Sequence, residues 1–207
     1  FFIPHLLVFK RIFEYSLLAH AYQMTGQYKK EKRLFREADR DFPDDPAIIW
    51  LKAILSLTEE DTIAANKYIE QYKSFRRDKS WTEAGIAYSV ARIYVEAGNL
   101  EKAEEYHRLE LSFEPDDPFR MWDLASFLIE KDRNINEGME LVNKALELKP
   151  DEHWFLDSKG WGLYKQGKYD EALKVLEKSR DLSPLYRHQV YLHIEEVKKA
   201  IALQKTN

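Results

Sequence analysis

The sequence predicts an all-α fold built from repeated helix pairs, and three observations support this prediction. Apolar residues recur at the i, i+3, i+4 and i+7 spacings of amphipathic helices, and no long segment alternates as a strand does. Seven Gly and seven Pro in 207 residues are too few for a β-sandwich or a disordered chain. Turn residues also share one period. Pro43, Pro115, Pro150 and Pro184 are separated by 72, 35 and 34 residues, and Gly26, Gly98 and Gly167 by 72 and 69. Units of about 35 residues, each with two helices, account for these gaps.

The first unit, residues 12–45, has the clearest pattern. Its first helix carries an apolar stripe at Tyr15, Leu18, Ala19 and Tyr22, and Gly26 then turns the chain. Its second helix carries Tyr28, Leu34, Phe35 and Ala38, and Pro43 ends it.

Four further units follow at 46–80, 81–117, 118–151 and 152–184. Asp45-Pro46 and Asp117-Pro118 each predict a capping residue followed by Pro in the first helical position. The tetrapeptide "SWTE" (80–83) matches a capping box. Residues 46–80 form a degenerate unit, because they lack a Gly turn and a terminal Pro, and their assignment depends mainly on filling the 72-residue gap.

The two ends differ from the units. Residues 1–11 begin with an apolar stretch only nine residues long, far shorter than the ~20 residues that span a bilayer. They are interpreted either as a helix that packs on the domain or as the stub of a membrane helix lying upstream. On the second interpretation, Lys10-Arg11 favours a cytoplasmic domain of a membrane-attached protein. Residues 185–207 fit a capping helix and tail, since a repeat array needs a terminal element with a polar outer face.

The composition favours a protein without enzymatic activity. The absence of cysteine excludes disulfides, Cys-based metal sites and Cys nucleophiles. A net charge of −4, with acids and bases interspersed, argues against nucleic acid as a partner. His188 and His193 are five residues apart, so they do not form the i, i+4 pair of a metal site. No nucleophile elbow occurs. We therefore expect no catalytic residue, no metal and no cofactor.

One stretch, "GLYKQGKYDEA" (162–172), imitates a phosphate-binding loop. Gly162 and Gly167-Lys168 have the right spacing, but Tyr169 replaces the Ser or Thr that holds Mg²⁺, and the preceding residues are helical in pattern. In the repeat frame Gly167 is the turn between two helices, and Tyr169 begins the second helix.

These residues resemble the tetratricopeptide repeat (TPR) family over roughly residues 12–184. The family pattern of aromatic or Leu, small residue, Tyr, Gly turn, aromatic, Ala and terminal Pro is strong in units one, three and five. Glu31 and Glu110 depart from it, since they replace small residues of the second helix. The resemblance implies an α-solenoid of about five helix-turn-helix units in a right-handed superhelix. It also implies that the first helices line a concave groove that takes a peptide or helix.

The groove expected from this resemblance carries aromatic residues. Its predicted contacts are Trp50, Tyr88, Arg92, Trp122, Asp123, Trp154, Asp157 and Trp161. Trp and Tyr dominate binding hot spots. The Lys/Asn/Arg set that clamps a C-terminal carboxylate in chaperone-binding TPR domains is missing. The ligand is therefore expected to offer apolar or aromatic side chains and one acidic contact to Arg92. Alternatively, some of these rings pack between adjacent units.

The leading hypothesis is a scaffold that binds a protein or peptide. One alternative is an accessory or regulatory domain of a larger membrane-tethered protein whose active region lies upstream. Another is carbohydrate binding on the Trp row, with Asp123 and Asp157 as hydrogen-bond partners of sugar hydroxyls. The oligomeric state and the identity of the partner are left open.

Overall fold

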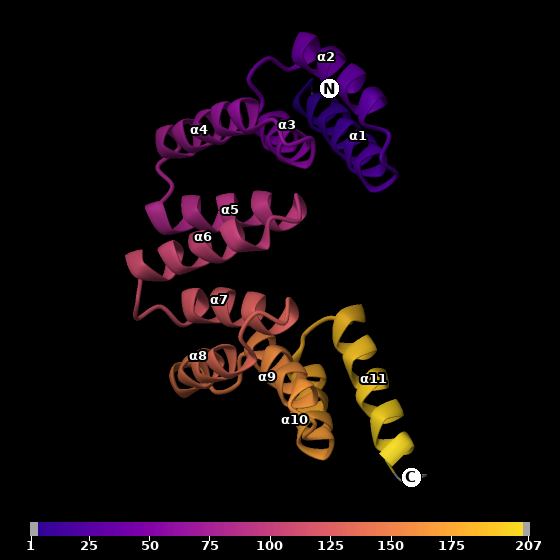
Figure 1. The fold of residues 1–207 in the computed structure, drawn as a ribbon, viewed down its shortest axis with the longest axis vertical. Coiled ribbons are helices and arrows are strands. Elements are labelled where there is room, and N and C mark those ends of the chain that lie inside the picture. The colour runs from indigo at the N-terminus through magenta and orange to yellow at the C-terminus, as the bar shows by residue number, and fades with distance from the viewer. Residues whose placement is uncertain (1–3, 205–207) are drawn as a thin grey trace. The chain divides into compact units, whose positions relative to one another are not determined.

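The computed structural model describes residues 4–204, with side-chain surroundings from residue 12 onward. Over this range every regular element is a helix, which confirms the predicted all-α fold. The helices are α1 (Pro4–Met24), α2 (Tyr28–Asp41), α3 (Pro46–Thr58), α4 (Thr62–Asp78), α5 (Glu83–Glu96), α6 (Leu100–Phe113), α7 (Pro118–Glu130), α8 (Ile135–Leu148), α9 (His153–Lys165), α10 (Tyr169–Leu182) and α11 (His188–Gln204) (Figure 1). No described helix is both long enough and apolar enough to cross a bilayer. The prediction for residues 1–11 stays a prediction. Residues 1–3 lie outside the described residues, and the side chains of residues 4–11 lie outside the described side chains.

The chain divides into two compact units, Phe1–Tyr106 and His107–Asn207, called here the N-terminal and the C-terminal unit. The division falls within α6. In the N-terminal unit α1 packs on α2, α3 packs on α4, and α3 also contacts α1 and α5. In the C-terminal unit α7 packs on α8, α9 packs on α10, and α9 also contacts α7 and α11. Within each unit the first helices of successive pairs therefore lie next to one another.

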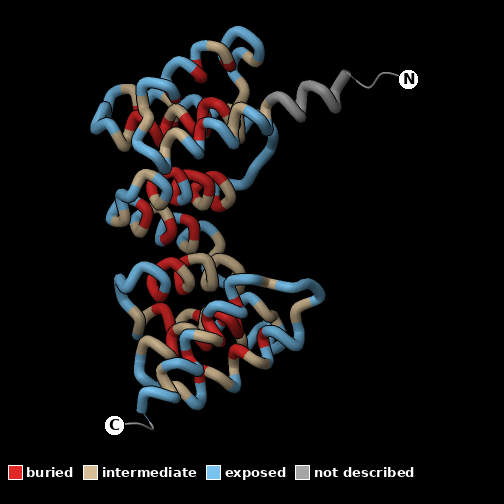
Figure 2. Tube along the Cα trace, turned by 90° about the vertical axis from the view of Figure 1, so that its right-hand side faces the viewer, coloured by how far each residue is buried: buried red, intermediate tan, exposed pale blue. Residues whose placement is uncertain are grey.

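Small residues lie where paired helices approach each other. The buried alanines of the repeat pattern, all at most 1% exposed, are Ala19, Ala38, Ala53, Ala65, Ala91, Ala103, Ala125, Ala145 and Ala172. The two helices α9 and α10 approach closer still at Gly160, where an added Cβ would lie 2.6 Å from Cγ of Leu176. Helices approach to about 8–10 Å only where bulky side chains do not separate them. Buried and exposed residues accordingly alternate along the helices (Figure 2).

The turn inside each pair has one conformation whether or not it contains glycine. Gly26, Gly98 and Gly167 have φ of 66°, 79° and 77°, in the left-handed region that favours glycine. In the two pairs without this glycine, Glu60 and Asp132 occupy the corresponding place with φ of 60° and 53°. The degenerate unit thus keeps the conformation of the turn without the glycine that marks it in the sequence.

Two of the three predicted helix starts are confirmed. Asp45 and Asp117 cap α3 and α7, and each accepts hydrogen bonds from two backbone N–H groups. The capping box at 80–83 is wrong, because Thr82 caps α5 and its hydroxyl accepts from the N–H of Gly85 at 3.1 Å. Ser80 instead has a φ of 58° and belongs to the turn before Trp81.

Candidate functional site: an aromatic pocket with two arginines

The N-terminal unit contains a pocket of about 440 Å³. Its lining residues come from α1, α3, α4 and α5 and from the turn before α5. They are Ser16, Pro46, Ala47, Trp50, Leu51, Tyr72, Arg76, Trp81, Tyr88, Ser89 and Arg92. Three predicted groove residues, Trp50, Tyr88 and Arg92, therefore line one pocket.

Local sequence fixes the walls of this pocket. The carboxylate of Asp45 accepts from the N–H of Ala47 at 2.9 Å and sets the first turn of α3, which Pro46 starts with a preset φ. Trp50 lies one turn further along this helix, where its ring is part of the pocket and also packs on the core of α1–α3. On α5, Tyr88 and Arg92 are four residues apart and share a helix face.

Arg76 of α4 is held by aromatic rings. Its guanidinium carbon lies 4.0 Å from the ring centroid of Trp81 and 4.7 Å from that of Tyr72. Its Nη2 donates to the hydroxyl of Tyr72 at 2.7 Å, and its buried Nε has no hydrogen-bond acceptor. These contacts orient the cation through ring faces and a hydroxyl, which leave its charge uncompensated.

Arg92 is the second cation of the pocket. Its Nη2 lies 3.3 Å from Oε1 of Glu96, and it also forms a hydrogen bond with Tyr88. Burial lowers the pKa of Arg92, but the interactions with Tyr88 and Glu96 outweigh burial and raise the pKa overall. The guanidinium therefore stays charged at any physiological pH.

In the C-terminal unit the predicted tryptophans contact residues of the same unit. Nε1 of Trp122 donates to the hydroxyl of Ser158 at 2.9 Å, and its ring lies 6.0 Å from that of Trp154. The guanidinium carbon of Arg187 lies 3.7 Å from the ring centroid of Trp154. Trp161 stacks on His193, with ring centroids 4.2 Å apart and planes 11° apart. Residues from the C-terminal segment thus cover part of this aromatic row.

Asp157 links the same two residues. Its carboxylate lies 3.4 Å from Nη2 of Arg187 and 2.8 Å from Nδ1 of His193, and its side chain is 8% exposed. Val190 of α11 is buried in the core to which α9 and α10 also contribute. The role of Asp157 as a groove contact stays a prediction, since its carboxylate is engaged within the chain.

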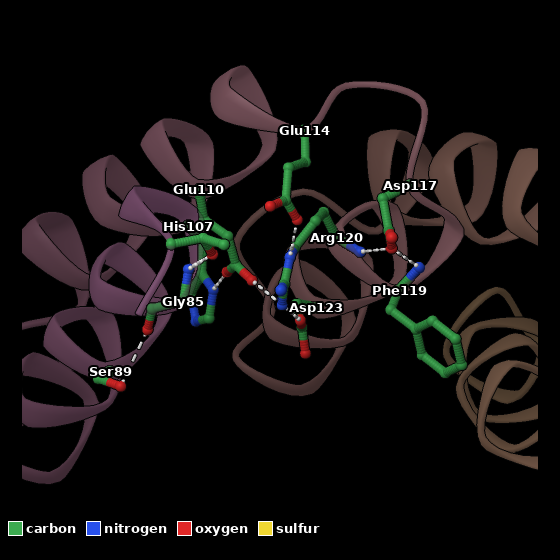
Figure 3. Close-up of polar contacts among 10 residues, drawn as sticks. Gly85, Ser89, His107, Glu110, Glu114, Asp117, Phe119, Arg120 and Asp123 are labelled. Atoms are coloured by element: carbon green, nitrogen blue, oxygen red, sulfur yellow. Dashed lines mark hydrogen bonds and ion pairs between the residues drawn. The ribbon is translucent and has the colours of Figure 1, made fainter. Parts of the chain in front are cut away.

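Asp123 belongs to a buried charge cluster around Arg120 (Figure 3). Arg120 contacts Glu110 at 3.0 Å, Glu114 at 2.9 Å and Asp123 at 3.5 Å. Glu110, itself fully buried, also contacts Nδ1 of His107 at 3.2 Å. Burial raises the pKa of Glu110 to about 7. Burial, together with the nearby charge of Glu110, raises the pKa of Asp123 to about 8. The two carboxyls thus bind a proton near neutral pH, and the groove role of Asp123 stays a prediction.

The chain was also compared with known proteins. No family model matches it. It is 30% identical over 114 residues to a TPR repeat-containing protein of Pseudomonas aeruginosa, a match that covers 55% of this chain and 19% of that protein. The Sgt2 TPR domain from Aspergillus fumigatus superposes with a TM-score of 0.55, at 16% identity, over 61% of this chain and 84% of that chain.

Two further solved structures cover more of the chain. YrrB, described as a TPR protein with an unusual peptide-binding site, gives a TM-score of 0.51 at 14% identity over 91% of this chain and 97% of that chain. Yeast Tom70 gives 0.56 at 18% identity over 92% of this chain and 40% of that chain. The described helix pairs therefore have the fold of these tetratricopeptide repeat structures.

Tyr72, Arg76 and Trp81 line the pocket but are absent from the predicted set. The sequence predicts groove residues on the first helix of each unit, whereas Arg76 and Tyr72 lie on the second helix, α4, and Trp81 lies between units. The sequence feature that indicates this part of the pocket is Trp81, which follows Arg76 by five residues and lies in a turn.

Proposed function

We propose that the N-terminal unit binds a peptide segment of a partner protein in this pocket, and that the chain acts as a non-enzymatic interaction scaffold. The observation that supports the proposal is the convergence of Trp50, Tyr88 and Arg92 on one pocket. The TPR relatives support a role in protein–protein interaction, and YrrB is described as having a peptide-binding site.

The lining chemistry suits a peptide. Ligand sites combine mostly apolar and aromatic walls with a few well-placed polar groups, and here Trp50, Leu51 and Pro46 provide apolar wall beside two guanidinium groups. Rings such as Trp50 offer a large contact area at low cost in side-chain entropy.

The other predicted contacts enter the proposal conditionally. Trp154 and Trp161 would reach a ligand only beside, or in place of, the side chains of Arg187 and His193, and Trp122 already donates to Ser158. The carbohydrate hypothesis gains no support here, because Asp123 and Asp157 already bind Arg120 and Arg187 of the same unit. The membrane-tethered accessory domain also stays a hypothesis.

The test is selection from a random dodecapeptide phage library on the immobilised full chain. Selected peptides should bind the wild type and lose most of their affinity for Trp50→Ala and Tyr88→Ala. Tyr191→Ala is the matched control, because Tyr191 is exposed on α11 and does not line the pocket. Circular dichroism checks that each variant folds. Binding that Trp50→Ala leaves unchanged, or no selected peptide at all, would refute the proposal.

A further inference from the structure

We infer that the pocket of the N-terminal unit recognises an acidic residue inside a peptide, next to an aromatic or large aliphatic residue. Arg76 and Arg92 bind the carboxylate, and the neighbouring side chain packs on Trp50 and Trp81. The inference rests on the proposed function and adds the class of ligand to it.

The pocket carries positive charge that its own walls do not match. The walls of the pocket include two arginines and no acidic residue. Elsewhere in this unit basic side chains have acidic partners. Examples are Lys52 with Asp39, Lys32 with Glu59, and Arg77 with Glu83. No carboxylate among the described residues pairs with Arg76, so an acidic ligand would complete the site electrostatically.

The side chain of Arg76 is preorganised by its neighbours. Trp81 and Tyr72 hold the guanidinium of Arg76 against their rings, with its carbon 4.0 and 4.7 Å from the two ring centroids. Of its five N–H donors, Tyr72 takes one, and no other described group accepts from it. A carboxylate is the acceptor that matches a planar guanidinium fork. Because the rings fix Arg76 before the ligand arrives, little side-chain entropy is lost on binding.

The two cations of the pocket lie on helices from different pairs. Arg76 is on α4, the second helix of its pair, while Arg92 is on α5, the first helix of the next pair. The two charges therefore differ in origin from a clamp built on first helices for a chain terminus. The aromatic and aliphatic walls around them, Trp50, Leu51 and Trp81, require a ligand with bulk on both sides of its charge. An internal Asp or Glu beside an apolar residue fits this requirement, and a free anion does not.

The experiment uses two pooled libraries of fluorescent dodecapeptides with amidated C-termini. Both fix Phe or Leu at a central position, and the preceding residue is Glu in one pool and Gln in the other. Binding to the full chain is measured by fluorescence anisotropy for the wild type, Arg76→Gln, Arg92→Gln, and the control Arg33→Gln. Arg33 lies on α2, outside the pocket, with its side chain 78% exposed.

We expect the Glu pool to bind the wild type about tenfold more tightly than the Gln pool. Arg76→Gln should remove most of this preference, Arg92→Gln should reduce it, and Arg33→Gln should keep it. Equal binding of the two pools, with both still sensitive to Trp50→Ala, would overturn the acidic specificity and leave the proposed function standing. If neither pool responds to Trp50→Ala, the proposed function itself fails. Displacement of the Glu pool by inorganic phosphate alone would also overturn the inference, because it would assign the site to a free anion.

Discussion

The N-terminal and C-terminal units place residues of the predicted groove in contrasting surroundings. In the N-terminal unit, Trp50 lines a pocket whose cation Arg76 has no acidic partner among the described residues. In the C-terminal unit, Trp154 and Asp157 are met by Arg187 from the segment that precedes α11. A position in the repeat therefore determines which face a residue occupies. Its neighbours in the chain decide whether its charge and ring remain available to a ligand.

Buried carboxyls differ between the units in the same way. Glu31 and Glu110 both occupy positions where the repeat normally has a small residue, and both are at most 1% exposed. Glu110 contacts Arg120 and His107, whereas Oε2 of Glu31 has no hydrogen-bond partner. The departure from the repeat pattern thus carries a satisfied network in one unit and an unsatisfied group in the other.

The largest effect on stability is expected at Asp157 of the C-terminal unit, whose carboxylate contacts Arg187 and His193. Asp157→Ala should lower the free energy of unfolding by about 3 kcal/mol, because it leaves Arg187 and the buried His193 without their shared acceptor. In the N-terminal unit, Arg92→Gln should change it by less than about 0.5 kcal/mol, since its exposed ion pair with Glu96 contributes little. Urea unfolding followed by circular dichroism measures both.

The matched control for Asp157→Ala is Asp151→Ala. Asp151 pairs with Lys178 at 2.8 Å, but its side chain is 71% exposed, so its removal should cost less than about 0.5 kcal/mol. If the two aspartate variants lose the same small amount, the covering of Trp154 and Trp161 contributes no stability, and the contrast between the units disappears.

A smaller effect is expected from pH, because Glu110 and Asp123 share their environment and their protons. Both pKa values are raised, to about 7 and about 8, above the usual values for Glu and Asp. A raised carboxyl pKa gives stability that is complete below the unfolded pKa, near 4, and is lost as pH rises through the folded pKa. The C-terminal unit should therefore unfold more easily at about pH 9 than at about pH 6.

This pH dependence can be assigned to one unit. A variant with Trp50 and Trp81 changed to Phe keeps only the tryptophans of the C-terminal unit, so its fluorescence reports that unit. Adding Glu110→Gln and Asp123→Asn should flatten the dependence between pH 6 and 9. An unchanged slope in that variant would show that other groups cause it.

The unsatisfied carboxyl gives an effect of opposite sign. Burial, with a contribution from Glu59, raises the pKa of Glu31 to about 7, and its Oε2 has no partner. Glu31→Ala restores the small residue of the repeat and should raise the free energy of unfolding by about 1 kcal/mol. Glu110→Ala should lower it instead, because Arg120 and His107 lose a partner. Urea unfolding of both variants tests the pair, and the same sign for both would contradict the contrast.

The sequence predicted the helix pairs because period, helix stop and glycine turn are local features. It predicted Trp50, Tyr88 and Arg92 as groove residues for the same reason, since a repeat position determines a helix face. It missed Arg76 and Trp81 because their contact joins a second helix to a turn, and no repeat position encodes that contact. It also could not predict that Arg187 and His193 meet Asp157, since they lie 30 and 36 residues further along the chain.

The smallest effects concern the two turns that lack glycine, one in each unit. Glu60 and Asp132 have φ of 60° and 53°, a conformation that costs a residue with a Cβ about 1 kcal/mol relative to glycine. Glu60→Gly should therefore stabilise the chain by about 1 kcal/mol, less the entropy that glycine adds to the unfolded state. Asp132→Gly should stabilise the chain less, because this change also removes the ion pair that Asp132 forms with Lys165 at 2.6 Å. Thermal unfolding can rank the two variants, with Gly98→Ala, which reverses the change, as a destabilising reference. A larger gain from Asp132→Gly than from Glu60→Gly would mean that the ion pair contributes nothing and that the strain in the two turns is unequal.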